Sequence, residues 1–114
     1  MSTESQTFVL GKNVPKEVVG DGFRRQLLGY SNELMVARIE ADAGAVGDVH
    51  THPHTQVTYI ESGVFDVTID GVTKRLEAGD SVLVRSELVH GLVCVEAGVL
   101  LDVFNPVRED FLPE

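Results

Sequence analysis

Residues 50–56 read HTHPHTQ, and a lone histidine, His90, follows downstream. Strand side chains alternate between two faces, so His50 and His52 project to the same side of a strand. Gln56 and a histidine from another strand can then converge with them on one cation. Neutral imidazole is a common metal ligand, and three imidazoles with an amide oxygen suit a divalent transition metal. We therefore expect a metal at His50, His52, Gln56 and His90; the alternative is a solvated polar loop.

The composition limits the domain organisation and the partners. The chain has 114 residues, enough for one domain over residues 1–114, and we expect disorder over the polar residues 1–6. The formal net charge of −9 argues against nucleic acid and anionic membrane surfaces as partners, but not against a small anionic substrate. A single cysteine, Cys94, fits a reducing compartment, and we expect it to be buried and inert. No segment is typical of a membrane span or a signal peptide, so we expect a cytoplasmic protein.

The hydrophobic pattern has a period of two. Apolar and polar residues alternate along residues 33–41 and 64–70, which is typical of half-buried antiparallel strands. Only residues 14–19 are a candidate for a short helical turn. Further strands are expected at residues 81–84, 90–95 and 99–104.

Glycine dipeptides separate these runs. Asp70-Gly71 predicts a hairpin because glycine supplies a positive φ, and Asp21-Gly22 is a weaker signal of the same kind. Four more dipeptides are expected to end strands: Ala43-Gly44, Ser62-Gly63, Ala78-Gly79 and Ala97-Gly98. Many short strands with regular turns predict an all-β sandwich or barrel.

Two spaced motifs carry a family resemblance. They read Gly44-x5-His50-x-His52-x3-Gln56-x6-Gly63 and Gly79-x5-Arg85-x-Glu87-x2-His90. They resemble the cupin motifs G-x5-H-x-H-x3-4-E-x6-G and G-x5-P-x-G-x2-H-x3-N. Gln56 stands in place of the usual Glu, and Arg85, Glu87 and Cys94 stand in place of Pro, Gly and Asn. The resemblance implies a cupin double-stranded β-helix, or jelly-roll barrel, with the metal inside.

The closing segment narrows the resemblance. Residues 101–112 read LDVFNPVREDFL, which resembles the D-x-F-x-P-x-R-x-D-F-L ending of the KdgF family, as H-x-H-P-H-x-Q resembles its first motif. This resemblance implies a metal-dependent enzyme that converts 4,5-unsaturated monouronates from pectin or alginate breakdown to linear 5-keto-4-deoxyuronate. It also implies a homodimer and no organic cofactor.

The residue types fit that chemistry. A neutral Gln56 leaves the cation its full +2 charge, which favours an anionic substrate and Lewis-acid chemistry. The donor set admits zinc, nickel, manganese, iron or copper. An iron-dependent dioxygenase and a non-catalytic binding module therefore stay open as alternative functions.

Three residues near the C-terminus are candidates for catalysis. Asp102 and Phe104 share strand parity, so Asp102 could deliver a proton and Phe104 could stack on the sugar ring. Arg108 could form a two-point pair with the substrate carboxylate. The alternatives are an exposed strand Asp, a core Phe, and a surface salt bridge from Arg108 to a neighbouring acid.

Two further positions are less clear. Parity places His54 on the face of the other histidines, but Pro53 interrupts the strand, so we interpret His54 as a neighbour of the site rather than a ligand. Arg24 or Arg25 could also reach the cavity, and no spacing argument selects one of them.

Overall fold

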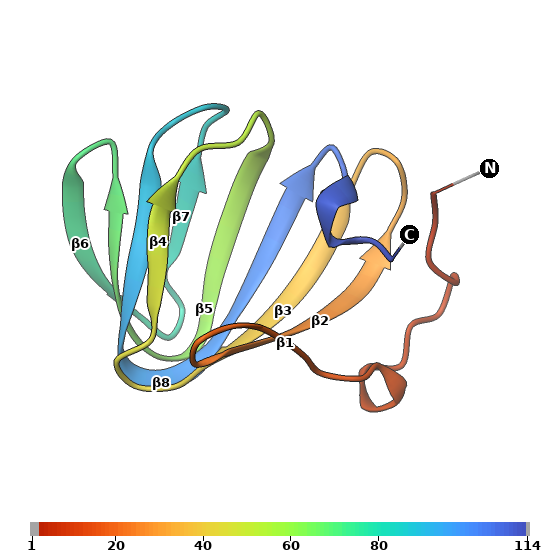
Figure 1. Ribbon diagram of the computed structural model, residues 1–114, viewed down its shortest axis with the longest axis horizontal. Helices are drawn as coiled ribbons and strands as arrows, with labels where there is room; N and C mark the ends of the chain where they lie inside the picture. Colours follow the sequence, from red (N-terminus) through yellow and green to blue (C-terminus); the bar gives the residue numbers. More distant parts are fainter. Residues whose placement is uncertain (1–2, 114) are drawn as a thin grey trace.

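The computed structural model describes residues 3–113 and consists almost entirely of β-strands in one hydrogen-bonded network (Figure 1). The predicted all-β class is confirmed. The strands are β1 (Glu17–Gly20), β2 (Phe23–Tyr30), β3 (Met35–Ala41), β4 (Val46–His50), β5 (Thr55–Ile69), β6 (Val72–Glu77), β7 (Ser81–Val84) and β8 (His90–Asn105). Two short 3-10 helices, η1 (Gly11–Asn13) and η2 (Glu109–Phe111), lie near the ends of the chain.

Two long antiparallel strands, β5 and β8, run through both layers of the fold. The first part of β5 pairs with the second part of β8, from Thr55↔Asn105 to Ile60↔Leu100, in the layer that also holds β1, β2, β3 and β7. The second part of β5 pairs with the first part of β8, up to Ile69↔His90, in the layer with β4 and β6. Figure 1 shows β2 and β3 on one side and β4 and β6 on the other.

The expected strand ends at Ser62-Gly63 and Ala97-Gly98 are wrong. Both dipeptides lie inside continuous strands, so residues 90–95 and 99–104 belong to the single strand β8. The register shifts on either side of Ser62, and Gly63 has a φ of 84°. A Cβ on Gly63 would lie 2.7 Å from the Cα of Gly98. The two glycines therefore allow the long strands to touch where they pass from one layer to the other.

The hairpins predicted at Asp21-Gly22 and Asp70-Gly71 are confirmed, since they join β1 to β2 and β5 to β6. The helical turn expected at residues 14–19 is wrong, because residues from Glu17 onward form β1 at the sheet edge. Two β-branched valines in that segment favour the extended backbone.

The N-terminal segment is only partly described. Residues 1 and 2 lie outside the described residues. Within the described part, Ser5 exchanges two hydrogen bonds with Tyr30, of 2.9 and 3.0 Å, and the disorder expected over residues 1–6 stays a prediction. No helix within residues 3–113 is long and apolar enough to cross a membrane.

The core lies between the two layers. Alternate residues of β3 are buried, namely Met35, Ala37, Ile39 and Ala41, as the period of two predicts. Phe65 and Phe104 fill the space between them and the facing layer. Cys94 is buried at 1% exposure, and burial raises the pKa of its thiol, which agrees with the expected inert role.

Candidate metal centre and its cavity

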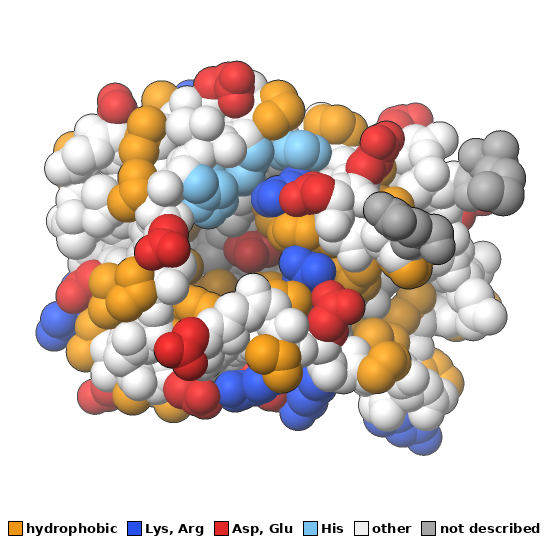
Figure 2. All heavy atoms as spheres, in the orientation of Figure 1, with side chains coloured by type: hydrophobic (Ala, Val, Ile, Leu, Met, Phe, Trp, Pro, Cys, Tyr) orange, Lys and Arg blue, Asp and Glu red, His pale blue; other side chains and the backbone are white. Residues whose placement is uncertain are grey.

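A cavity of about 290 Å³ opens between the layers at one end of the core. Its wall combines apolar side chains with a small set of polar ones, the pattern of a small-molecule site. The polar and aromatic members of the wall are Phe23, Arg25, His50, Gln56, Thr58, His90, Asp102, Phe104, Arg108 and Phe111. Figure 2 shows histidine side chains along one edge of a hollow in which acidic, basic and hydrophobic side chains are also visible.

The strand register places the polar residues of the cavity side by side. Asp102 on β8 pairs with Thr58 on β5 and with Ala37 on β3. Two residues further along β8, Phe104 pairs in the same way with Gln56 of β5. Because residues two apart share a face, these side chains all project into the space between the layers.

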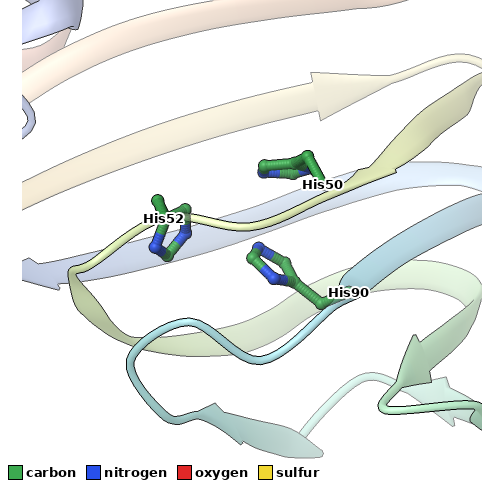
Figure 3. Close-up of side chains that lie close together, drawn as sticks. All are labelled: His50, His52 and His90. Carbon is green, nitrogen blue, oxygen red and sulfur yellow. The ribbon is translucent and has the colours of Figure 1, made fainter.

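Three histidines converge at the edge of the cavity. His50 ends β4, His52 lies in the loop that follows, and His90 begins β8 as the register partner of His50. One ring nitrogen from each lies within 4.8 Å of the other two. Figure 3 shows the three rings gathered around one space. The sequence prediction that His90 meets the His50/His52 pair is confirmed.

The hydrogen bonds of the rings prepare them to bind a cation. Each Nδ1 lies against a backbone carbonyl: His50 against Asp48 at 2.8 Å, His90 against Leu88 at 2.8 Å, and His52 against His54 at 3.1 Å. Donation from Nδ1–H leaves the Nε2 lone pairs free, which is the usual outer-shell arrangement of metal-bound histidine.

Two details of the rings favour the neutral, metal-binding form. The Nε2 atom of His90 is buried with no hydrogen-bond partner among the described residues. Burial lowers the pKa of both His52 and His90, which favours neutral imidazole over imidazolium. A buried lone pair of this kind is satisfied by a cation.

Gln56 lies beside the three histidines and offers an amide oxygen. Its Oε1 lies 2.9 Å from Nε2 of His52. Both ring nitrogens of His52 thus face oxygen atoms, although neutral imidazole carries only one N–H. A cation shared by Nε2 of His52 and Oε1 of Gln56 satisfies both atoms. Three imidazoles and one amide oxygen fit a divalent transition metal.

Gln56 also connects the histidines to Asp102. Its Nε2 donates to Oδ1 of Asp102 at 3.1 Å, and the Thr58 hydroxyl donates to the same oxygen at 2.6 Å. Burial raises the pKa of the Asp102 carboxyl, and these two hydrogen bonds oppose the rise. Asp102 is therefore a cavity residue, not the exposed strand Asp of the alternative interpretation.

Arg108 lines the cavity but is already paired. Its side chain is 12% exposed, and its Nε and Nη2 bind both carboxylate oxygens of Asp110, at 3.0 and 2.8 Å. Its guanidinium carbon lies 4.2 Å from the centre of the Phe111 ring and 5.1 Å from that of Phe104. The salt bridge to a neighbouring acid, which was the alternative interpretation of Arg108, therefore exists. Arg108 also lines the cavity, where a substrate carboxylate could reach it.

Phe104 and His54 pack beside His52. Phe104 is 2% exposed and packs edge-on against His52, His54 and Phe111, so it is a core residue that also forms cavity wall. His54 is outside the histidine cluster; its Nε2 donates to the carbonyl of Val107 at 3.1 Å. This agrees with the interpretation of His54 as a neighbour of the site.

The structure separates the two arginines that the sequence left open. Arg25 lines the cavity, whereas Arg24 pairs with Asp42 and Glu40 on the outer face. Sequence reasoning also missed Thr58 and Phe111. Parity could have found Arg25 and Thr58, because Arg25 shares a strand face with the core-packed Phe23 and Leu27 of β2, and Thr58 follows Gln56 by two positions.

The loop before His90 departs from the cupin motif in sequence, yet it holds His90 beside the other two histidines. Glu87 stands where the cupin motif has glycine, and it adopts a φ of 66°. Its backbone N–H donates to the carbonyl of His52 at 2.8 Å, which ties this loop to the histidine loop. His90 therefore reaches the site despite a non-glycine residue in the left-handed region.

Comparisons with known proteins agree with this geometry. A family model described as a cupin domain matches residues 37–104. The pectin degradation protein KdgF of Dickeya dadantii is 36% identical over 107 residues, which cover 92% of this chain and 97% of that protein. The solved structure of KdgF from Halomonas sp. has a TM-score of 0.90 at 31% identity and covers 95% of this chain and 100% of that one. An RmlC-like cupin from Shewanella frigidimarina has a TM-score of 0.94 at 47% identity and covers 96% of this chain and 98% of that one. The chain therefore belongs to the KdgF family of cupins.

Proposed function

We propose that this chain is a metal-dependent enzyme that opens 4,5-unsaturated monouronates to linear 5-keto-4-deoxyuronate. The observation that carries the proposal is the hydrogen-bonded connection from His52 through Gln56 to Asp102, of which Gln56 and Asp102 line the same cavity as Arg108. The name of the Dickeya relative, a pectin degradation protein, supports a substrate from the same class of polysaccharide.

We assign the metal to His50, His52, His90 and Gln56. When bound, a divalent metal supplies Lewis acidity and positive charge to an oxygen of the substrate. The four protein donors are neutral, which suits a carboxylate or enolate-like ligand. The chemistry of the donors leaves the identity of the metal open among zinc, nickel, manganese, iron and copper.

Asp102 is the proton donor in this proposal. Both of its hydrogen bonds from the described side chains reach Oδ1, so Oδ2 is the oxygen that can carry a proton. The raised pKa keeps a larger protonated fraction than an exposed carboxyl would have. The proton goes to carbon four of the enol ether, water adds to carbon five, and the resulting hemiketal collapses with cleavage of the bond to the ring oxygen. The change is redox-neutral.

Arg108 binds the substrate carboxylate, and Phe104 forms the wall against which the ring lies. The carboxylate approaches a guanidinium that Asp110 and Phe111 hold in place. A fixed fork loses little rotational freedom on binding, which favours recognition of a planar carboxylate.

A direct assay tests the proposal. The metal-loaded protein is incubated with unsaturated monouronates prepared from pectin and from alginate, and loss of the alkene's ultraviolet absorbance is followed. Loss that stops after chelation and returns with metal supports the proposal. Oxygen uptake with bound iron would instead support a dioxygenase, and tight sugar-acid binding without turnover would support a binding module.

A further inference from the structure

We infer that Arg25 is a second carboxylate-binding residue, which forms a two-guanidinium clamp with Arg108 around the acid group of the ligand. The choice of a monouronate as ligand rests on the proposed function. Arg25 lies on β2, on the opposite edge of the cavity wall from the β5 residues, and pairs in register with Ile39 of β3, which also lines the cavity.

Arg25 has an N–H donor without an acceptor among the described residues. Its side chain is 13% exposed, yet its Nε is buried with no hydrogen-bond partner among residues 3–113. Its one ion pair runs from Nη2 to Glu17, at 2.8 Å, and the Glu17 side chain is 63% exposed. A guanidinium carries five N–H donors, and one exposed carboxylate on an edge strand satisfies few of them. Arg108 differs, because Asp110 already occupies two of its donors in a parallel pair.

One aromatic ring links the two arginines. The guanidinium carbon of Arg25 lies 3.8 Å from the centre of the Phe111 ring, and that of Arg108 lies 4.2 Å from the same centre. Stacking on an aromatic face orients a guanidinium and leaves its edge donors available. Phe111 thus brings two guanidinium groups, each with one carboxylate partner, to one part of a cavity in a protein whose formal net charge is −9.

The presence of two guanidinium groups at one end of the cavity has a chemical consequence. A carboxylate has two oxygens and about four acceptor positions, so two guanidinium groups can bind it at once. A neutral sugar offers no matching charge. The clamp therefore selects sugar acids over neutral sugars, and it places the acid group at the Phe111 end of the cavity.

The test measures binding of galacturonate, a saturated monouronate, and of neutral galactose to the metal-loaded protein by calorimetry. We expect Arg25→Gln to weaken galacturonate binding by about ten- to a hundredfold, the range for a charged hydrogen bond, with no change for galactose. Arg24→Gln is the matched control, because Arg24 is adjacent in sequence but pairs with Asp42 outside the cavity. It should bind galacturonate like the wild type.

A second variant guards against a folding defect, since Arg25→Gln also removes the stack on Phe111. Glu17→Gln leaves the guanidinium in place and replaces its competing carboxylate by a neutral amide, so galacturonate binding should become a few times tighter. Retained discrimination in a folded Arg25→Gln, unchanged binding in Glu17→Gln, or no galacturonate binding by the wild type would each overturn the clamp. Galacturonate binding through Arg25 without consumption of unsaturated monouronates would support the clamp and overturn the proposed reaction.

Discussion

The amide of Gln56 donates to Oδ1 of Asp102 across 3.1 Å, while its own oxygen lies 2.9 Å from Nε2 of His52. One side chain thus contacts both His52, a candidate metal ligand, and Asp102, the candidate acid. A glutamate at this position would keep an oxygen for the metal but would lose the N–H that Asp102 accepts. The neutral amide therefore serves two neighbours with opposite requirements, an oxygen for a cation and a donor for a carboxylate.

We predict that Gln56→Glu retains metal and lowers activity on an anionic substrate. The added charge weakens Lewis acidity and substrate capture, and it places a second carboxylate beside Asp102, which disfavours ionisation of both. Metal analysis and steady-state kinetics on one preparation measure the effect. Equal or higher kcat/KM with metal bound would contradict a charge role for Gln56.

We predict that Asp102→Asn keeps the fold and the metal but removes most turnover. Asparagine is nearly isosteric and can still accept the hydrogen bond from Thr58 through Oδ1. It cannot supply a proton, and a general acid contributes ~10²–10⁴-fold. Turnover measured beside metal content decides the question, and a loss below about tenfold would make Asp102 a structural residue.

We predict that Arg108→Lys raises KM by roughly tenfold or more, since lysine keeps the charge but loses the fork. Metal content should stay unchanged. Asp110→Asn is a matched variant, because it removes the negative charge opposite Arg108 and one of its two acceptor oxygens while it keeps the guanidinium. A melting curve accompanies the kinetics: if Arg108→Lys unfolds, the residue ties down the C-terminal segment, and if it matches the wild type, carboxylate recognition lies elsewhere.

We predict that the stabilising effect of Glu40 is lost in acid. Lys16 and Arg38 contact its carboxylate at 2.8 and 2.9 Å and lower its pKa from 4.5 to about 2. A lowered folded-state pKa contributes stability above the unfolded value of 4.5, and that contribution disappears as the pH falls toward 2. Urea unfolding should show Glu40→Gln less stable than wild type at neutral pH, with the difference shrinking in acid. A constant difference would contradict the prediction.

We predict that Gly63→Ala destabilises the fold by at least ~2 kcal/mol. The φ of 84° is unfavourable for alanine, and the new Cβ would lie 2.7 Å from the Cα of Gly98. Gly29→Ala is the control, because nothing lies within 4 Å of a Cβ built there. Denaturant unfolding should place the control within ~0.5 kcal/mol of wild type. Similar stability of the two variants would show that the close approach of β5 and β8 can relax.

Much of the site could be predicted because it depends on short-range spacing. His50 and His52 are two residues apart and their rings meet as predicted, although His52 lies in the loop after β4 and not on a strand face; the hairpin at Asp70-Gly71 depends on a local backbone requirement. Glycine dipeptides were less reliable. Ser62-Gly63 has the composition of a turn, but its glycine permits a close strand crossing, which no local pattern distinguishes from a strand end.

The sequence by itself determined the strand alternation, the donor types at the candidate metal site and the family motifs, since each follows from residue chemistry and local period. Only the tertiary structure decided which distant residues meet. Gln56 and Asp102 are in contact because the register of β5 against β8 pairs Gln56 with Phe104 and Thr58 with Asp102. A shift of one residue would turn either side chain to the opposite face. Arg25 reaches Phe111 through the packing of β2 against the C-terminal segment. Register and packing are long-range properties that depend on the whole set of strand pairings, so they are not contained in any one stretch of the chain.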